Sequence, residues 1–254
     1  MEHIERHDNG KMRMKANIED GKLQGEVLSF DEEERLVHKA NYKDGVLEGE
    51  SITFNAETGR ELQTSVFKKG VLHGDTIAYD EAGRLSQRSS FVEGKLSGEL
   101  QIYLEGKLRT KIVYVDGKQN GPFVSYDEKG KELVRSFYEN GKLNGEAQFF
   151  DGKGKTLRKV HYRDDKLHGP ATEYHLNGAV RETAVYKDGS KEGECLGYYE
   201  SGALRSKAYY KGGELRGEPI EYDEDGKVKP PPNEGGPKKP SVFGKIAGKL
   251  GGGA

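Results

Sequence analysis

The chain has 254 residues, of which 33% are hydrophobic and 33% charged, and its mean hydropathy is −0.88. This composition is too polar for one compact domain with a thick core, whereas 14 Tyr and 9 Phe are too many aromatic residues for a disordered chain. With 41 basic against 43 acidic residues, the charge does not favour a general nucleic-acid binder.

Residues 1–17 are expected to form an N-terminal cap. Charge begins at the second residue, and no apolar segment of a secretory signal is present. Residues from about Gly10 to Asn17 match only the second half of the unit that follows. Because Cys195 is the only cysteine and no apolar run approaches membrane-spanning length, we expect a cytoplasmic protein without an internal disulfide.

Residues 18–229 consist of about nine copies of a unit of roughly 24 residues. Its frame is aromatic-x-x-Gly-x-Leu-x-Gly-Glu-x-x-x-aromatic-x-x-x-Gly, as in the segments that begin at Tyr114 and Tyr138. The second glycine recurs at Gly25, Gly49, Gly74, Gly98, Gly121, Gly145, Gly169, Gly193 and Gly217. Five residues later an aromatic follows each time, at Phe30, Phe54, Tyr79, Tyr103, Tyr126, Phe150, Tyr174, Tyr198 and Tyr222.

Each unit predicts a β-hairpin. Asp-Gly and Asn-Gly pairs such as Asp20-Gly21 and Asn140-Gly141 are typical of type I′ turns, and the third glycine closes the other turn. Between the turns the residues alternate: Glu50, Ile52 and Phe54 share one face of a strand. The sequence therefore predicts an all-β, elongated antiparallel hairpin array, an open sheet or solenoid of about 18 strands. Stacked units would share a leucine column at Leu23, Leu47, Leu72, Leu96, Leu143, Leu167 and Leu215.

The frame resembles the MORN-variant repeat of bacterial proteins and covers nearly all of residues 10–229. It differs from the eukaryotic MORN unit in lacking Trp and in placing Glu after the second glycine. The resemblance implies a β-hairpin repeat fold. It also implies a protein-binding role, as an antitoxin or an immunity-type protein kept beside a toxin.

Two columns of side chains are candidates for partner binding. The carboxylates after the second glycine would form an acidic stripe for a basic partner, or would pair with neighbouring cations such as Lys22, Lys95, Lys142 and Arg158. The aromatic columns would form an exposed binding strip or a buried spine. The candidate partner-binding residues are Tyr79, Tyr103, Tyr126, Tyr174, Tyr198, Glu50, Glu99, Glu146 and Glu194.

No catalytic, cofactor or metal site is predicted. His161, His168 and His175 are spaced by seven residues, but neither a third ligand at a diagnostic spacing nor a cysteine pair accompanies them. Cys195 has no His/Asn constellation and is expected to be an ordinary strand residue. The glycines fit turns, because no phosphate-binding loop motif occurs. We therefore expect a protein that is not an enzyme.

Residues 230–254 are expected to form a flexible Pro/Gly-rich tail. A short amphipathic helix within it would place Phe243, Ile246 and Leu250 on one side as candidate docking residues. The main interpretation is that the repeat face sequesters a toxin by steric occlusion. The alternatives are a scaffold or adaptor for secretion or envelope assembly that docks through the tail, and a membrane-associated organiser. The organiser would bind lipid through Lys238, Lys239, Lys245 and Lys249, and a membrane partner is not the main expectation.

Overall fold

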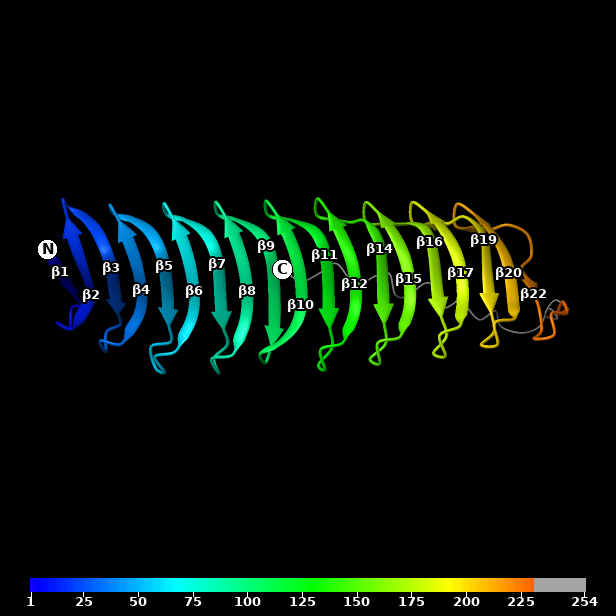
Figure 1. The fold of residues 1–254 in the computed structure, drawn as a ribbon, viewed down its shortest axis with the longest axis horizontal. Helices are drawn as coiled ribbons and strands as arrows, with labels where there is room; N and C mark the ends of the chain where they lie inside the picture. Colours follow the sequence, from blue (N-terminus) through cyan, green and yellow to red (C-terminus); the bar gives the residue numbers. More distant parts are fainter. Residues whose placement is uncertain (231–254) are drawn as a thin grey trace.

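The computed structural model describes residues 1–230 of the chain, and these residues form one open antiparallel sheet (Figure 1). Strands pair with their neighbours in chain order, and each of three divided strands pairs through both of its halves with the strand before it, so the sheet is a meander from β1 at one end to β22 at the other. This confirms the predicted all-β hairpin array. The residues of the tail, Phe243, Ile246 and Leu250 among them, lie outside the described part.

The strands are β1 (Glu2–Arg6), β2 (Met12–Glu19), β3 (Lys22–Phe30), β4 (Leu36–Lys43), β5 (Val46–Phe54), β6 (Glu61–Lys68), β7 (Val71–Tyr79), β8 (Leu85–Val92), β9 (Lys95–Leu104), β10 (Lys107–Val115), β11 (Lys118–Tyr126), β12 (Glu132–Glu139), β13 (Lys142–Leu143), β14 (Gly145–Phe150), β15 (Thr156–Arg163), β16 (Lys166–Tyr174), β17 (Val180–Lys187), β18 (Ser190–Lys191), β19 (Gly193–Tyr198), β20 (Leu204–Lys211), β21 (Glu214–Leu215) and β22 (Ile220–Glu221). They number 22 because three strands are divided in two at or just before the second glycine of their unit, and because β1 adds one strand to the 18 that the repeat predicts. No helix that could cross a membrane occurs in residues 1–230.

The first kind of turn has the backbone that its residues predict. Asp20 and Gly21 have φ of 49° and 74°, which are the positive values that a type I′ turn requires. The amide of each following turn glycine donates to the preceding unit: Gly70 N–H bonds to Leu47 O at 2.9 Å, and Asp165, which replaces a glycine, donates likewise to Leu143 O. The turns at this end of the strands are therefore hydrogen-bonded from one unit to the next.

In several units the second kind of turn, at the opposite ends of the strands, is closed by a carboxylate, whereas the Asn55 amide oxygen closes the turn between β5 and β6. Asp80 Oδ1 accepts hydrogen bonds from the amides of Ala82 and Arg84, and Asp127 and Asp151 repeat this pattern in later units. A short side chain that caps its own turn replaces hydrogen bonds which the strands cannot supply there. The bonds from these amides contribute to a lowered pKa at each of the three Asp carboxyls.

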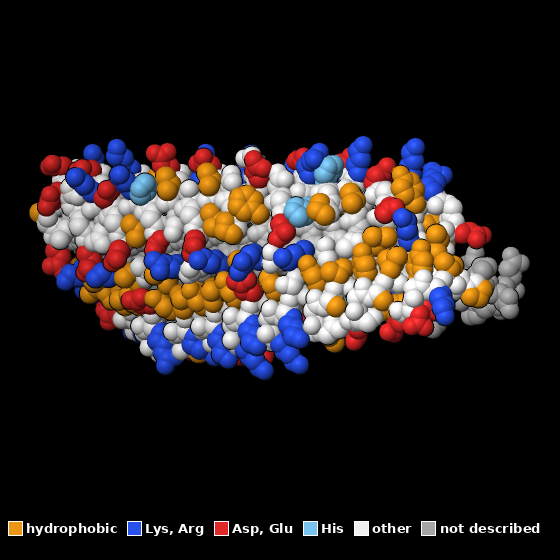
Figure 2. All heavy atoms as spheres, turned by 45° about the vertical axis from the view of Figure 1, so that its right-hand side comes forward, with side chains coloured by type: hydrophobic (Ala, Val, Ile, Leu, Met, Phe, Trp, Pro, Cys, Tyr) orange, Lys and Arg blue, Asp and Glu red, His pale blue; other side chains and the backbone are white. Residues whose placement is uncertain are grey.

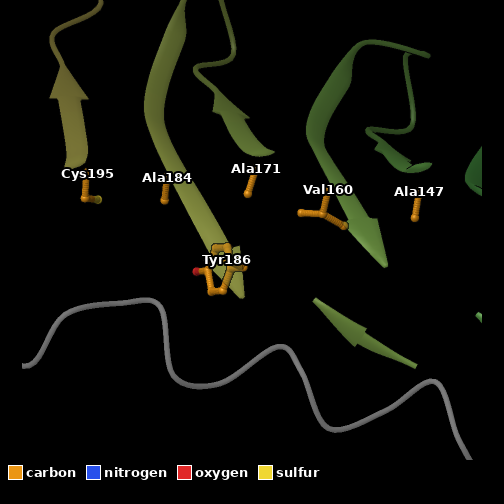
Figure 3. Close-up of a cluster of buried hydrophobic side chains, with 6 residues drawn as sticks. All are labelled: Ala147, Val160, Ala171, Ala184, Tyr186 and Cys195. Atoms are coloured by element: carbon orange, nitrogen blue, oxygen red, sulfur yellow. The ribbon is translucent and has the colours of Figure 1, made fainter. Parts of the chain in front are cut away.

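One face of the sheet holds the buried core, and we call it the small-residue face. Along its centre runs a row of residues that lie opposite one another on successive strands, for example Val27 opposite Ala40 and Thr76 opposite Ser89. The buried members are Ala16, Val27, Ala40, Ser65, Thr76, Ser89, Ile112, Ser136, Ala147, Val160, Ala171, Ala184 and Cys195. Six side chains of the C-terminal core cluster, Tyr186 included, project to one side of the sheet in Figure 3.

Larger side chains beside this row shield it from solvent. Tyr162 lies opposite Leu167 and Tyr138 opposite Leu143, so the predicted leucine column pairs with the aromatics that precede the first glycine. Tyr162 and Leu167 pack against the buried cluster. A sheet without a second layer in its described part thus buries small residues beneath its own neighbouring rings, which explains how so polar a chain folds.

Candidate partner-binding face

The nine candidate binding residues lie on the face opposite the small residues, which we call the charged face. Strand alternation fixes this placement: Ser51 lies opposite buried Ser65, so Glu50, Ile52 and Phe54 of the same strand point to the other side. The carboxylates and the aromatics form two parallel rows across the strands. The sequence pattern thus groups these residues correctly, and the row between them carries cations such as Lys39, Arg88, Lys111 and Lys207.

The aromatic row forms a continuous strip with its cross-strand neighbours. Tyr79 lies opposite Leu85, Tyr103 opposite Leu108, and the other units repeat this register. We define the aromatic band as Phe30, Leu36, Phe54, Tyr79, Leu85, Tyr103, Leu108, Tyr126, Phe150, Tyr174, Val180, Tyr198 and Leu204, all of which are half-buried. Figure 2 shows hydrophobic side chains gathered in bands along the molecule between rows of Lys and Arg.

The two aromatic columns of the repeat therefore have different environments. The column from Tyr42 to Tyr210 belongs to the small-residue face, where Tyr162, Tyr186 and Tyr210 pack in or against the core. The column from Phe30 to Tyr198 belongs to the charged face. The rings of both columns are half-buried in most units, with Tyr186 fully buried; the first column packs on the core row, and the second lies on the face without such a row.

The carboxylate row is largely neutralised by diagonal ion pairs. In four units the carboxylate bonds to the cation that lies two residues from its direct partner on the next strand. The pairs are Glu26 with Lys39 at 2.5 Å, Asp75 with Arg88 at 2.6 Å, Glu99 with Lys111 at 2.7 Å and Glu194 with Lys207 at 2.6 Å. The predicted pairing cations, Lys22, Lys95, Lys142 and Arg158, do not take part, because none of them lies at the diagonal position. Lys142, for instance, pairs with Asp164.

The pKa of two carboxyls in this row reflects the pairing. The pKa of Asp75 is lowered by hydrogen bonds from the Ser90 hydroxyl and from Arg88, and the pKa of Glu99 is lowered by a hydrogen bond from Lys111. Glu146 instead accepts from Gln148 and lies 3.9 Å from His161. The geometry favours cross-strand pairing over an acidic stripe.

Glu50 breaks the pattern. The diagonal position on the next strand holds Thr64 instead of a cation, and no ion pair of Glu50 occurs within residues 1–230. Pro122 takes the carboxylate position in another unit, where Arg135 bonds to Glu132 instead. The row of charges is therefore not uniform along the sheet, and such irregularity is what a face needs to recognise one partner in one register.

A charged cluster on the small-residue face is a feature that sequence analysis missed. Glu182 accepts from Lys191 Nζ at 3.0 Å and from the Cys195 thiol at 2.9 Å. Arg158 lies 3.7 Å from Glu173, and both are largely buried. The position of Lys191 carries Leu in most other units, and that of Glu182 carries neutral residues such as Gln63, Gln87 and Thr110, so a comparison of units position by position could have found the cluster.

The histidines and the cysteine have separate environments. His161 Nδ1 lies 3.2 Å from Pro170 O, His168 Nδ1 lies 3.2 Å from Asp188, and His175 Nε2 lies 3.0 Å from Tyr198 O. Within residues 1–230, no three His, Cys, Asp or Glu side chains are arranged to hold a metal ion. Burial, and then the bond to Glu182, raises the pKa of the Cys195 thiol to about 11.

Comparisons with known proteins match part of the repeat region to a family. Residues 133–151, 167–188 and 191–211 match the family described as MORN repeat variant. No curated protein matches the chain. Solved structures similar to it include the crystal structures of TcdB2-TccC3-Cdc42 and of TcdB2-TccC3, each 12% identical with a TM-score of 0.24. The matches cover 85% of this chain but only 14% of those chains. At this TM-score the likeness supports no statement about function.

Proposed function

We propose that this MORN-repeat chain is a protein-binding protein that covers a partner surface with its aromatic band and does not act by catalysis. The observation that carries the proposal is the band itself. It runs along a face that no second layer covers within the described residues, and its rings are half-buried.

The chemistry of the band suits a protein interface. Tyr and Phe offer large contact areas at a low cost in side-chain entropy. The Tyr hydroxyl can also hydrogen-bond to water at the rim of an interface. The neighbouring row of Lys and Arg adds charges that fix register. Because the band is built on strands hydrogen-bonded on both sides, it is preorganised, and little ordering is needed when a partner binds.

The specific role we propose is that of a cytoplasmic antitoxin or immunity-type protein. The match to the MORN repeat variant supports it together with the length of the band, which suits steric occlusion of an extended surface. The partner would be a toxin whose exposed surface carries apolar groups that pack on the band and polar groups that meet the ion-paired rows beside it. Inhibition would then require no chemistry from this chain.

The test uses the product of the adjacent gene as the candidate partner. Tyr103→Ala combined with Tyr126→Ala removes two adjacent rings of the band. The matched control is Ile102→Ala, because Ile102 is the residue next to Tyr103, faces the other side and is 38% exposed. We expect the double variant to bind at least about tenfold more weakly and to lose protection against growth inhibition, whereas the control keeps both.

The outcomes separate the two parts of the proposal. If the purified chain neither binds nor protects against that product, the antitoxin role is wrong. If binding occurs but the double variant, still folded by circular dichroism, binds like the wild type, the aromatic band is not the binding surface. A chain that ends at Val228 should keep its affinity, since the band lies within the described residues.

A further inference from the structure

The first strand leaves one edge of the sheet open. β1 pairs with β2 on one side, and none of residues 1–230 pairs with its other side (Figure 1). The opposite end of the sheet is blunted, since β22 has only two residues and the chain reaches Pro230 soon afterwards. Of the two edges, β1 is therefore the one that offers a full strand.

The hydrogen bonds of the first hairpin show which groups of β1 face outward. Met1 and Ile18 exchange both backbone hydrogen bonds, at 2.9 Å each. Bonding alternates along an antiparallel strand, so His3 and Glu5 also point their backbone groups toward β2. Glu2, Ile4 and Arg6 consequently direct their N–H and C=O groups to the open edge.

The side chains of β1 are self-complementary when two such strands run antiparallel. With Ile4 opposite Ile4 of a second copy, Glu2 falls opposite Arg6, and His3 falls opposite Glu5. This register also places the outward backbone groups of Glu2, Ile4 and Arg6 opposite one another, as hydrogen-bonded pairs require. Ile4 is 42% exposed and would meet its own symmetry mate at the centre.

We propose that two copies of this chain join edge to edge through antiparallel pairing of β1. The contact is isologous, with a two-fold axis through Ile4 perpendicular to the sheet, so it closes at two copies. Charged side chains on an open edge usually prevent another strand from pairing with it. In this register Glu2 and Arg6 instead attract Arg6 and Glu2 of the second copy, because they lie at equal distances on either side of Ile4. The axis keeps both charged faces on the same side of a sheet of double length.

The neighbouring side chains are compatible with this contact. Lys15 Nζ lies 2.9 Å from Glu2, so Glu2 can be shared between Lys15 and Arg6 of the second copy. Arg6 Nη1 now bonds to Gly10 O at 2.9 Å on the exposed surface. A single strand pair is smaller than the about 1,200 Å² of a standard interface, so we expect the dimer to depend on concentration.

The test is sedimentation velocity of the full chain over a concentration series, with three variants. Glu2→Arg and Arg6→Glu each place like charges opposite one another, and should raise the dissociation constant at least about tenfold. Mixing the two variants should restore the dimer, because a basic side chain then faces an acidic one at both ends of the paired strands. Ile4→Pro should abolish it while the monomer stays folded, since the Ile4 amide faces outward.

Glu128→Arg, the same charge change at an exposed turn, is the control and should dimerise like the wild type. The proposal is overturned by a wild-type chain that stays monomeric at every concentration, or by one that grows into an open series of oligomers. It is also overturned if the mixed variants fail to associate, or if the Ile4→Pro chain still forms the dimer. None of these outcomes depends on the proposed toxin partner.

Discussion

Lys111 Nζ lies 2.7 Å from Glu99 Oε1, across the neighbouring strands β10 and β9. The hydrogen bond between them is the largest cause of both a raised pKa at Lys111 and a lowered pKa at Glu99. Both side chains are more than a third exposed, at 36% and 45%, so solvent screens much of their attraction. The pair therefore fixes the register of the charged face more than it stabilises the fold.

Glu99→Gln should lower the free energy of unfolding by only about 0.2–1 kcal/mol at pH 7, measured by urea denaturation. Because the folded-state pKa of Glu99 lies below its ordinary value of 4.5, the contribution is present above that pH. It fades as the pH falls from 4.5 through the lowered pKa, so wild type and variant should converge in acid. Glu50→Gln is the control, and an equal loss there would contradict the role of the ion pair.

Val160→Ala should destabilise the protein by about 1.5–3 kcal/mol, because Val160 is fully buried in the central row and its removal leaves a void. Val185→Ala is the matched change on the charged face, where Val185 is 48% exposed, and should cost less than about 0.5 kcal/mol. Thermal unfolding of the two variants measures the difference. Equal losses would mean that the small-residue face is not the core.

Gly121→Ala should destabilise the sheet more than Gly25→Ala, although both glycines hold the second position of the repeat. Gly121 has φ of 130°, and a Cβ there would lie 3.0 Å from Val113 Cβ on the neighbouring strand. Gly25 has φ of 72° and open space around it, a conformation that Ala enters at a cost of about 1–2 kcal/mol. Urea midpoints that fall equally would refute the steric account.

Cys195 should react slowly with iodoacetamide at pH 8 in the folded protein. The thiol is buried, and its pKa of about 11 against an ordinary 9.0 reduces the thiolate fraction by about 100-fold relative to the unfolded chain. Alkylation followed by mass spectrometry in buffer and in urea measures the ratio. Glu182→Gln removes the carboxylate that raises this pKa and should speed the folded-state reaction; an unchanged rate would assign protection to burial alone.

Much of the repeat could be predicted from single residues. Asp20-Gly21 specified its turn, since positive φ at both positions is costly for most other pairs. Alternation from Glu50 to Phe54 is enough to place carboxylates and aromatics on one face of the sheet. The carboxylate partners were wrong, because a diagonal contact depends on the register between strands and on the bulge at each second glycine.

The sequence by itself determined the hairpins, the period of the repeat and the composition of each face, because turn chemistry and alternation are local properties of the chain. Only the tertiary structure decided that Tyr162 packs on the core while Tyr103 lies in a half-exposed band. It also decided that Glu2, Ile4 and Arg6 direct backbone groups to an open edge. Those outcomes depend on the register between adjacent strands and on which side chains of consecutive units meet, and the alternation within a single strand does not specify either.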